Sequence, residues 1–328
     1  MSLSGVETKS DIKKIRRRLK AKDYTENILI SILPVIGFFI FGAFPMVMSL
    51  IMSFFEMKDP DFVQATFVGL ENYKTMFSFG VGGHGRDLLY TFSNIAIYTL
   101  NVFIGLAIAI YVSYQLNKIY VFRRLLRTIF FIPTVCSITV VTIVFKMFLG
   151  EYSGVFNQVL ASLGFESVAW LTGSPLLFNI SMIIVSVWSG LGYGIVLLQA
   201  AFAGVDESYA EAAAIDGATA GQIFWKITFH AITPTLGYLL TMRLIGSLQQ
   251  MGTYYQFGNG VIGIQQWPDS ALYTFNTPVT YIYSMFHDWA NSYGFGIASA
   301  TAWILAVVIF IITRINFRLQ EKWVSYDF

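Results

Sequence analysis

Six long apolar stretches constrain the fold of this chain more than any other feature. Each could cross a bilayer as a helix, which takes about 20 mostly apolar residues. The six stretches are residues 28–55, 88–116, 125–149, 176–203, 227–250 and 293–315. Only helices and closed barrels satisfy the backbone in lipid, and these runs lack the period-two alternation of barrel strands. We therefore predict an all-α, polytopic membrane protein with six transmembrane helices. Prolines inside the predicted spans should kink them, and they are Pro34, Pro45, Pro133 and Pro234.

The composition agrees with a membrane protein. Of the 328 residues, 55% are hydrophobic and only 12% are charged, whereas soluble domains carry roughly 25% charged residues. The chain therefore cannot cover a water-facing surface with charge. Cys136 is the only cysteine, which excludes a disulfide framework. The first apolar run is too long for a signal peptide and lacks a small-residue cleavage site, so we expect no cleaved leader.

Basic residues predict the orientation in the membrane. The first 27 residues contain eight lysines and arginines, the end of the second loop contains four more, and the last span is followed by Arg318 and Lys322. The third and fifth loops carry acids and no base. Basic residues favour the cytoplasmic side, so both termini are predicted to be cytoplasmic. The predicted organisation is a basic segment at 1–27, a six-helix membrane domain at 28–315 and a tail at 316–328. The basic segment could lie on anionic lipid as an anchor, or could bind a partner.

Several chemistries have no motif in this chain. It has no phosphate loop of the form GxxxxGK[ST], and no glycine is followed by lysine, so it cannot bind ATP in that manner. It also has no HExxH motif and no cysteine–histidine cluster, which argues against a metal site. No Asp or Glu lies within the six predicted spans, although ion-coupled carriers usually keep an intramembrane carboxylate. These absences indicate that the chain has no catalytic site and that its energy source is another chain.

The loop "SYAEAAAIDGATAGQIFWK" (208–226) contradicts the positive-inside pattern. The predicted topology places it in the cytoplasm, yet it carries Glu211 and Asp216 against the single base Lys226. Ser208 and Glu211 have capping-box spacing, which predicts a helix start. The alanines favour a helix with a slim surface, and Gly217 suits its C-terminal end. Such a helix could lie at the lipid interface without a partner, or could contact another protein.

A longer stretch, "EAAAIDGATAGQIFWKITFHAITP", resembles the EAA signature of permease subunits in binding-protein-dependent ABC importers. The matching residues are Glu211, Ala212, Ala213, Asp216 and Gly217, with Ile227 at the expected distance. The resemblance implies that residues 207–220 contain a coupling helix, which docks into a groove of an ATP-hydrolysing subunit. A protein socket would account for an acidic, alanine-lined cytoplasmic loop.

Four other stretches resemble the sugar branch of that family, the maltose- and glycerol-phosphate-type permeases. They are "FVGLENYKTMF" (67–77), "GVFNQVL" (154–160), "VWSGLGYGIVLLQAAF" (187–202) and "YGFGIASA" (293–300). The resemblance covers roughly 67–315 and implies a type I ABC importer permease fold. The chain departs from the pattern twice. His230 stands where a proline is usual, although Pro234 is retained. A long aromatic segment, within residues 251–292, replaces the usual glycine-glycine-proline.

Arg243 is the one charge deep inside a predicted span. At about 1.5 Å per residue from Thr228, it lies some 22 Å up a core of about 30 Å. Insertion scales assign such a group a cost of at least roughly 2.5–3.5 kcal/mol, so it should face the bundle interior or a cavity. It could pair with a backbone carbonyl or polar side chain, or it could contact a substrate carboxylate.

Further polar and aromatic side chains would suit a saccharide path. They continue from the same helix or lie in other spans: Gln249, Gln250, Tyr254, Tyr193 and Asn101. Amides can bond sugar hydroxyls and aromatic rings can pack on sugar faces, but aromatic residues are also common at membrane interfaces. Lys146, near the end of its span, is expected to snorkel to the interface.

These observations together predict a multi-pass subunit of a bacterial inner membrane importer for a sugar or oligosaccharide, neutral or uronate-containing. The implied partners are a second permease subunit, identical or different, two ATP-binding subunits that hold ATP and Mg, and an extracytoplasmic solute-binding protein. Lipid surrounds the subunit, and no nucleic acid is involved. The alternatives are a six-span secondary carrier of a polar solute, which needs a coupling-ion site, and an intramembrane enzyme, which needs a catalytic constellation.

Overall fold

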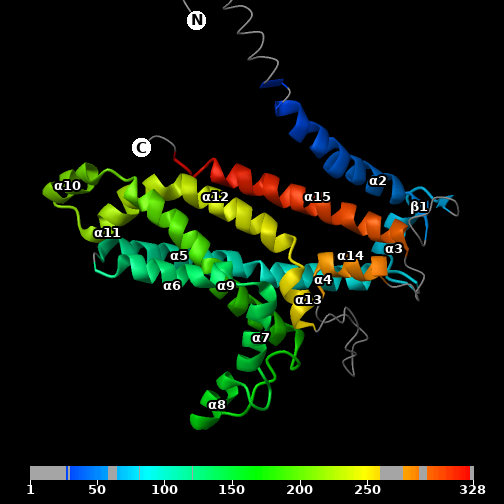
Figure 1. The fold of residues 1–328 in the computed structure, drawn as a ribbon, viewed down its shortest axis with the longest axis horizontal. Helices are drawn as coiled ribbons and strands as arrows, with labels where there is room; N and C mark the ends of the chain where they lie inside the picture. The colour runs from blue at the N-terminus through cyan, green and yellow to red at the C-terminus, as the bar shows by residue number, and fades with distance from the viewer. Residues whose placement is uncertain are drawn as a thin grey trace, which may run out of the picture.

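A computed structural model of the protein describes residues 27–28, 30–57, 65–80, 82–119, 121–258, 276–287 and 294–325. The first half consists of a π-turn η1 (Phe39–Ala43), α2 (Phe44–Met52), β1 (Phe55–Glu56), β2 (Thr66–Phe67), α3 (Glu71–Phe77), α4 (Gly85–Tyr98), α5 (Leu100–Lys118), α6 (Arg123–Val135), α7 (Ile138–Phe148) and α8 (Val155–Ser162). The second half consists of α9 (Pro175–Ala203), α10 (Glu207–Ile215), α11 (Ala220–Ile223), a π-turn η3 (Phe224–Thr228), α12 (Phe229–Leu248), α13 (Gly252–Phe257), α14 (Pro278–His287) and α15 (Phe295–Gln320). Figure 1 shows the long helices side by side, with α10 at one end of the molecule and α14 near the other.

The helical character predicted from the sequence is confirmed, apart from one short antiparallel strand pair. In that pair Phe55 lies opposite Phe67, and Glu56 lies opposite Thr66. Within the described residues, four helices are long and apolar enough to cross a membrane: Ile30–Met52, Gly85–Lys118, Pro175–Ala203 and Phe295–Gln320. A bent pair, α6 with α7, brings the number to five if it is one span. The fifth predicted span corresponds to α12, which is less apolar because it contains His230, Arg243 and several threonines. The count of six spans therefore stays a prediction.

The third predicted span, 125–149, is not one straight helix. It is broken at Cys136 and Ser137, whose backbones are extended, and its two halves are bent by 99°. Pro133 lies in the last turn of α6, where a proline removes a helix hydrogen bond. The Thr134 hydroxyl donates to the Ser189 carbonyl at 3.2 Å and so ties the end of α6 to α9. Figure 1 shows α7 leading away from α6 toward α8.

Two other predicted kink sites have local compensation. Pro45 lies in the first turn of α2, two residues after the π-turn Phe39–Ala43, in which the helix widens. Pro234 lies inside α12 and offers no N–H to the carbonyl of His230. The Thr233 hydroxyl donates to that carbonyl instead, at 2.7 Å. The carbonyl therefore keeps a partner, and α12 continues through the proline.

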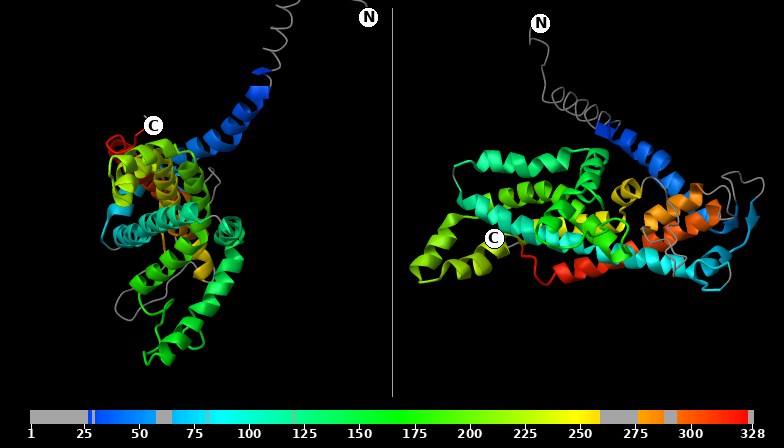
Figure 2. Two further views of the ribbon diagram at one scale, coloured as in Figure 1. Left: turned by 90° about the vertical axis from the view of Figure 1, so that its left-hand side faces the viewer. Right: turned by 90° about the horizontal axis from the view of Figure 1, so that it is seen from below.

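The 29-residue helix α9 is the centre of the bundle and contributes to two core clusters. Toward the α14 end, Phe178 and Met182 of α9 pack with Tyr98 and Tyr254. Toward the α10 end, Ile195 and Leu198 pack with residues of α5 and α12. By contrast, α2 has no buried residue. Figures 1 and 2 show α2 diverging from the other helices, and it contacts α15.

Candidate functional site

The predicted coupling segment lies at one tip of the molecule, where α10 extends beyond the other helices (Figure 1). No residue of α10 is buried. Ile215 is 87% exposed and Tyr209 is 56% exposed. The predicted coupling residues Glu211, Ala212, Asp216 and Gly217 are exposed, and Ala213 is half-buried. The structure thus brings all five together on one short helix and its exit turn.

The start of α10 differs from the sequence-based prediction. Asp206, not Ser208, is the capping residue, because its carboxylate accepts from the Ser208 backbone N–H at 2.9 Å. This backbone hydrogen bond lowers the pKa of Asp206 below its ordinary value. Among the described residues, Glu211 makes no hydrogen bond to the helix start, so its carboxylate is exposed and unpaired. The prediction missed Asp206 because two capping residues, Asp206 and Ser208, stand two positions apart.

The end of α10 confirms that Gly217 terminates the helix, as the sequence predicted. Its φ is +84°, and Ala218 N–H donates to the Ala213 carbonyl at 2.9 Å while Gly217 N–H donates to the Ala214 carbonyl at 3.1 Å. These two bonds define a Schellman motif. Directly afterwards, Thr219 and Gln222 form a capping box that starts α11. The pattern T-x-x-Q was visible in the sequence as a second helix start, but it was not used.

The segment after α11 connects the tip to the bundle. Phe224, at the start of the π-turn, packs on Tyr114 of α5 with ring centroids 4.5 Å apart. His230 stands where the family signature usually has proline, and its Nδ1 lies 3.0 Å from the carbonyl oxygen of Trp225. Since a carbonyl can only accept, Nδ1 donates this bond. The imidazole therefore joins the π-turn to the first turn of α12.

Arg243 lies where α12 meets α5 and α9. Its Nη2 donates to the Gly190 carbonyl of α9 at 2.5 Å, which is the backbone pairing that the sequence left as one of two roles. Two other glycines leave room for the guanidinium. A Cβ at Gly105 would lie 2.8 Å from Nη1, and a Cβ at Gly194 would lie 2.7 Å from Nη2. The glycines in "GLGYG" (190–194) are the sequence signal for this close approach.

Two half-exposed tyrosines lie on the same two helices as Arg243 and Gly190. Tyr193 of α9 is 43% exposed and Tyr238 of α12 is 49% exposed. Tyr193 lies beside Tyr238 and within electrostatic range of Arg243. The structure thus unites two predicted path residues, Arg243 and Tyr193, with Tyr238, which the sequence analysis did not select. We call Arg243, Tyr193 and Tyr238 the arginine site.

Gln250 and Tyr254 lie elsewhere, in a buried polar network toward the α14 end. Tyr254 is 1% exposed. Its ring contacts those of Tyr98 and Phe178, with centroids 5.4 and 5.6 Å away, and its hydroxyl donates to Asn179. Gln250 Nε2 lies 2.8 Å from the Tyr98 hydroxyl. In this structure these two residues therefore join helices together and are not part of the arginine site.

The remaining polar candidates are also apart from the arginine site. Asn101 Nδ2 donates to the Tyr98 carbonyl of the preceding turn at 2.5 Å, and Gln249 is exposed at the end of α12. Lys146 donates to the Gln256 carbonyl at 3.0 Å and so links α7 to α13. Within the described residues, no three His, Cys, Asp or Glu side chains are grouped so that they could hold a metal ion.

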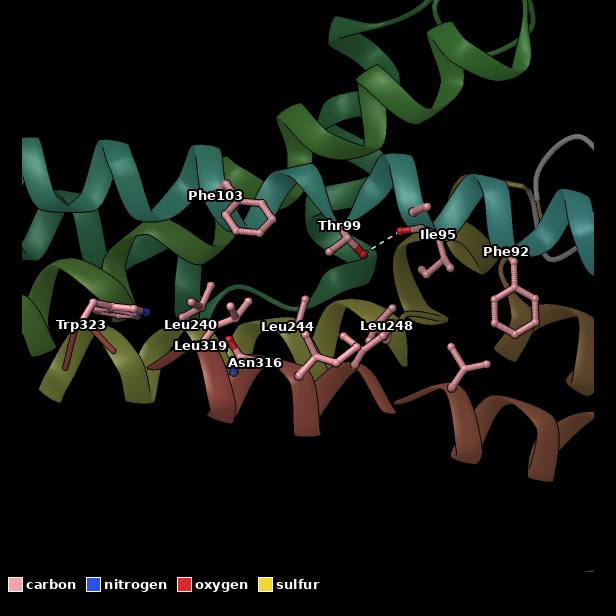
Figure 3. A pocket seen from close by; sticks show the side chains of 14 residues that line it. Phe92, Ile95, Thr99, Phe103, Leu240, Leu244, Leu248, Asn316, Leu319 and Trp323 are labelled. Carbon is pink, nitrogen blue, oxygen red and sulfur yellow. Dashed lines mark hydrogen bonds between the residues drawn. The ribbon is translucent and has the colours of Figure 1, made fainter. Parts of the chain in front are cut away.

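A groove of about 480 Å³ lies between α4 and α5 on one side and α12 and α15 on the other. Figure 3 shows its lining, which is apolar apart from Thr99, Asn316 and the ring nitrogen of Trp323. The Thr99 hydroxyl donates a hydrogen bond to the Ile95 carbonyl at 2.7 Å, and the Asn316 amide donates one to the Thr241 hydroxyl at 2.9 Å. None of the predicted path residues lines this groove, so it differs in place and chemistry from the arginine site.

Residues 88–325 match the family model described as "Binding-protein-dependent transport system inner membrane component". The chain is 29% identical over 294 residues to the probable ABC transporter permease protein YesP of Bacillus subtilis, covering 89% of each chain. It is 28% identical to the arabinooligosaccharides transport system permease protein AraP of Halalkalibacterium halodurans, covering 86% of this chain and 84% of the relative. It is also 28% identical to the alpha-glucoside transport system permease protein AglF of Rhizobium meliloti, covering 78% of this chain and 73% of the relative.

Two solved structures have the same fold. The first is a chain of a bacterial ABC transporter involved in the import of the acidic polysaccharide alginate, with a TM-score of 0.73 and 26% identity; the match covers 94% of this chain and 100% of that chain. The second belongs to a bacterial alginate ABC transporter in complex with an alginate pentasaccharide-bound periplasmic protein. Its TM-score is 0.73 and its sequence identity is 24%; the match covers 93% of this chain and 96% of that chain. The likeness extends along nearly the whole chain.

Proposed function

The chain belongs to the family of binding-protein-dependent transport system inner membrane components, and we propose that it is one of two permease subunits in an ATP-driven oligosaccharide importer. Relatives named for arabinooligosaccharide and alpha-glucoside transport support a saccharide substrate, as does the likeness to an alginate importer. The complete importer would add a second permease subunit, two ATP-binding subunits and an extracytoplasmic binding protein.

The observation that carries this proposal is the unpartnered helix α10. It has no buried residue, yet it displays Ile215, Tyr209 and a row of alanines. A helix that buries no face within its own chain gains little tertiary stabilisation, so its surface is suited to a partner. The exposed Glu211 and Asp216 would pair with basic groups of a protein socket. We assign that socket to the ATP-binding subunit.

Motion of α10 would reach the arginine site through described contacts. The Phe224–Tyr114 contact joins the tip to α5, and the His230–Trp225 hydrogen bond joins it to α12. Arg243 lies farther along α12 and bonds to Gly190 of α9. Closure of the ATP-binding subunits would therefore shift α12 against α9 and reorient the substrate path between two sides of the membrane. The permease itself performs no bond chemistry, and ATP and Mg would bind to the partner subunits.

Reconstitution in proteoliposomes tests this proposal. The complete importer, with binding protein, should take up a labelled oligosaccharide in an ATP-dependent manner. Omission of the ATP-binding subunits should abolish uptake, since this chain has no phosphate loop. The control is the same vesicle with an imposed proton or sodium gradient and no ATP-binding subunit. Gradient-driven uptake in that control would identify a secondary carrier and contradict the proposal.

The proposed topology has six spans and places both termini and α10 in the cytoplasm. It can be checked with single cysteines in a Cys136→Ser background. Tyr152, 93% exposed in the loop before α8, is expected to be outside. Tyr152→Cys should react with a membrane-impermeant thiol reagent added to intact cells. Ala214→Cys on α10 should react only after the cells are opened, and the reverse pattern would contradict the orientation. Asp269, in the predicted outer loop, lies outside the described residues.

A further inference from the structure

Within the described residues, the arginine site contains a cation without a counter-charge. No acidic side chain of the described residues forms an ion pair with Arg243. The side chain is nevertheless half-buried in α12, more than one turn before the last residue of that helix, Leu248. Charged groups within a membrane span usually pair or line a substrate pathway. The counter-charge of Arg243 is therefore expected from outside the described chain.

The guanidinium is held in place while most of its donors stay available. A guanidinium carries five N–H donors, and the structure assigns one bond, from Nη2 to the Gly190 carbonyl. A side chain at Gly105 or Gly194 would collide with Nη1 or Nη2, so these glycines form a seat that admits the planar group. A fixed, planar fork of donors matches the geometry of a carboxylate and binds it with two parallel hydrogen bonds.

The two tyrosines supply what a sugar ring requires beside a carboxylate. Tyr193 and Tyr238 are both half-exposed, and Tyr193 directly precedes Gly194, whose backbone packs against Arg243 Nη2. An aromatic ring offers an apolar face for packing, and its hydroxyl can donate or accept a hydrogen bond. The arginine site therefore combines an anion-binding fork with two amphipathic rings.

We propose that the arginine site recognises a hexuronate residue of the oligosaccharide in transit, which makes acidic oligosaccharides the substrate class. Arg243 binds the carboxylate, while Tyr193 and Tyr238 contact the ring and its hydroxyls. This inference rests on the proposed importer function and adds the residues that set its specificity. A carboxylate from the second permease subunit would be the competing source of the counter-charge.

The experiment measures uptake by the complete importer of labelled trigalacturonate and of the same trisaccharide with its carboxyl groups reduced. The two probes differ only at C6, which is a carboxylate in one and a hydroxymethyl group in the other. The variants are Arg243→Lys and Tyr238→Phe, with Arg124→Lys and Tyr111→Phe as matched controls at exposed positions. Each uptake rate is divided by that of the unmodified importer with the same probe. The unchanged contribution of the binding protein then cancels.

Arg243→Lys should reduce uronate uptake by about tenfold or more, because lysine keeps the charge and loses the two-pronged fit. Uptake of the reduced trisaccharide should change by less than about twofold, since it has no carboxylate to lose. Tyr238→Phe should lower uronate uptake by a smaller factor than Arg243→Lys does. The controls Arg124→Lys and Tyr111→Phe should transport like the unmodified importer.

Equal losses for both probes would overturn the inference and assign the counter-charge to the second permease subunit. Import of the reduced trisaccharide alone by the unmodified protein would overturn it too, and would leave the importer function intact. If neither probe nor any other oligosaccharide is taken up in an ATP-dependent manner, the importer function itself is rejected.

Discussion

Replacement of Gly217 by leucine is expected to lower ATP-driven uptake at least about tenfold, while the protein still inserts into the membrane. Gly217 has a φ of +84°, a left-handed conformation that costs an L-residue roughly 1–2 kcal/mol. Its backbone and that of Ala218 close the Schellman motif on Ala214 and Ala213. A nine-residue helix with no buried residue has no packing that could offset this strain. The exit of α10 should therefore open, and the helix should no longer fit its socket.

Gly221→Ala is the matched control for this prediction. Gly221 lies four residues further on, in helix α11, and an added Cβ would meet no atom within 4 Å. Alanine is the better helix former, so this substitution should leave transport unchanged. The measurements are uptake in proteoliposomes, the amount of permease in the membrane and co-purification of the ATP-binding subunit. If Gly217→Leu transports like Gly221→Ala with the ATP-binding subunit attached, α10 is not the coupling helix.

The long helices were predictable because apolar length is a strong signal, and Pro133 predicted a kink in the third span, but the size of that bend, 99°, was not predictable. The run 125–149 is mostly apolar, with Arg127 and Lys146 near its ends, and its length predicted one span. The break at Cys136 arises from tertiary contacts, because α6 is drawn against α9 through Thr134 and Ser189. Likewise, Asp206 and Ser208 both carry a side chain that can cap a helix. The choice between them depends on how the chain leaves α9.

The candidate site was predictable only in part, for a related reason. Arg243 was identified because a charge within a span needs compensation. The glycines of 190–194 indicate a close approach, but they do not identify the Gly190 carbonyl as its partner. Tyr254 and Gln250 were grouped with Arg243 because polar groups in a span can line a path. They can also join helices, as Tyr254 does with Asn179. Composition cannot distinguish these two uses, since they differ only in the direction that a helix face points.

The close packing of α6 on α9 leads to the last prediction. A Cβ at Gly192 would collide with the Phe130 carbonyl and would lie 2.7 Å from Phe131 Cα and from Thr134 Oγ1. Two of these atoms belong to backbone and cannot rotate away. Overpacking of this kind costs about 1–3 kcal/mol or more. Gly192→Ala should therefore lower the melting temperature of the purified permease by about 5 °C or more, because α6 must move off α9.

Gly190→Ala is the internal standard for that measurement. Gly190 lies two residues earlier in α9, and an added Cβ there would meet no atom within 4 Å. The substitution keeps the carbonyl that binds Arg243, so it should leave the melting temperature unchanged or raise it slightly. Both variants carry the same added methyl group in the same helix, so a difference between them reports the contact with α6. If the two melt together, α6 does not lie against α9 at Gly192, and the bent arrangement of α6 and α7 is wrong.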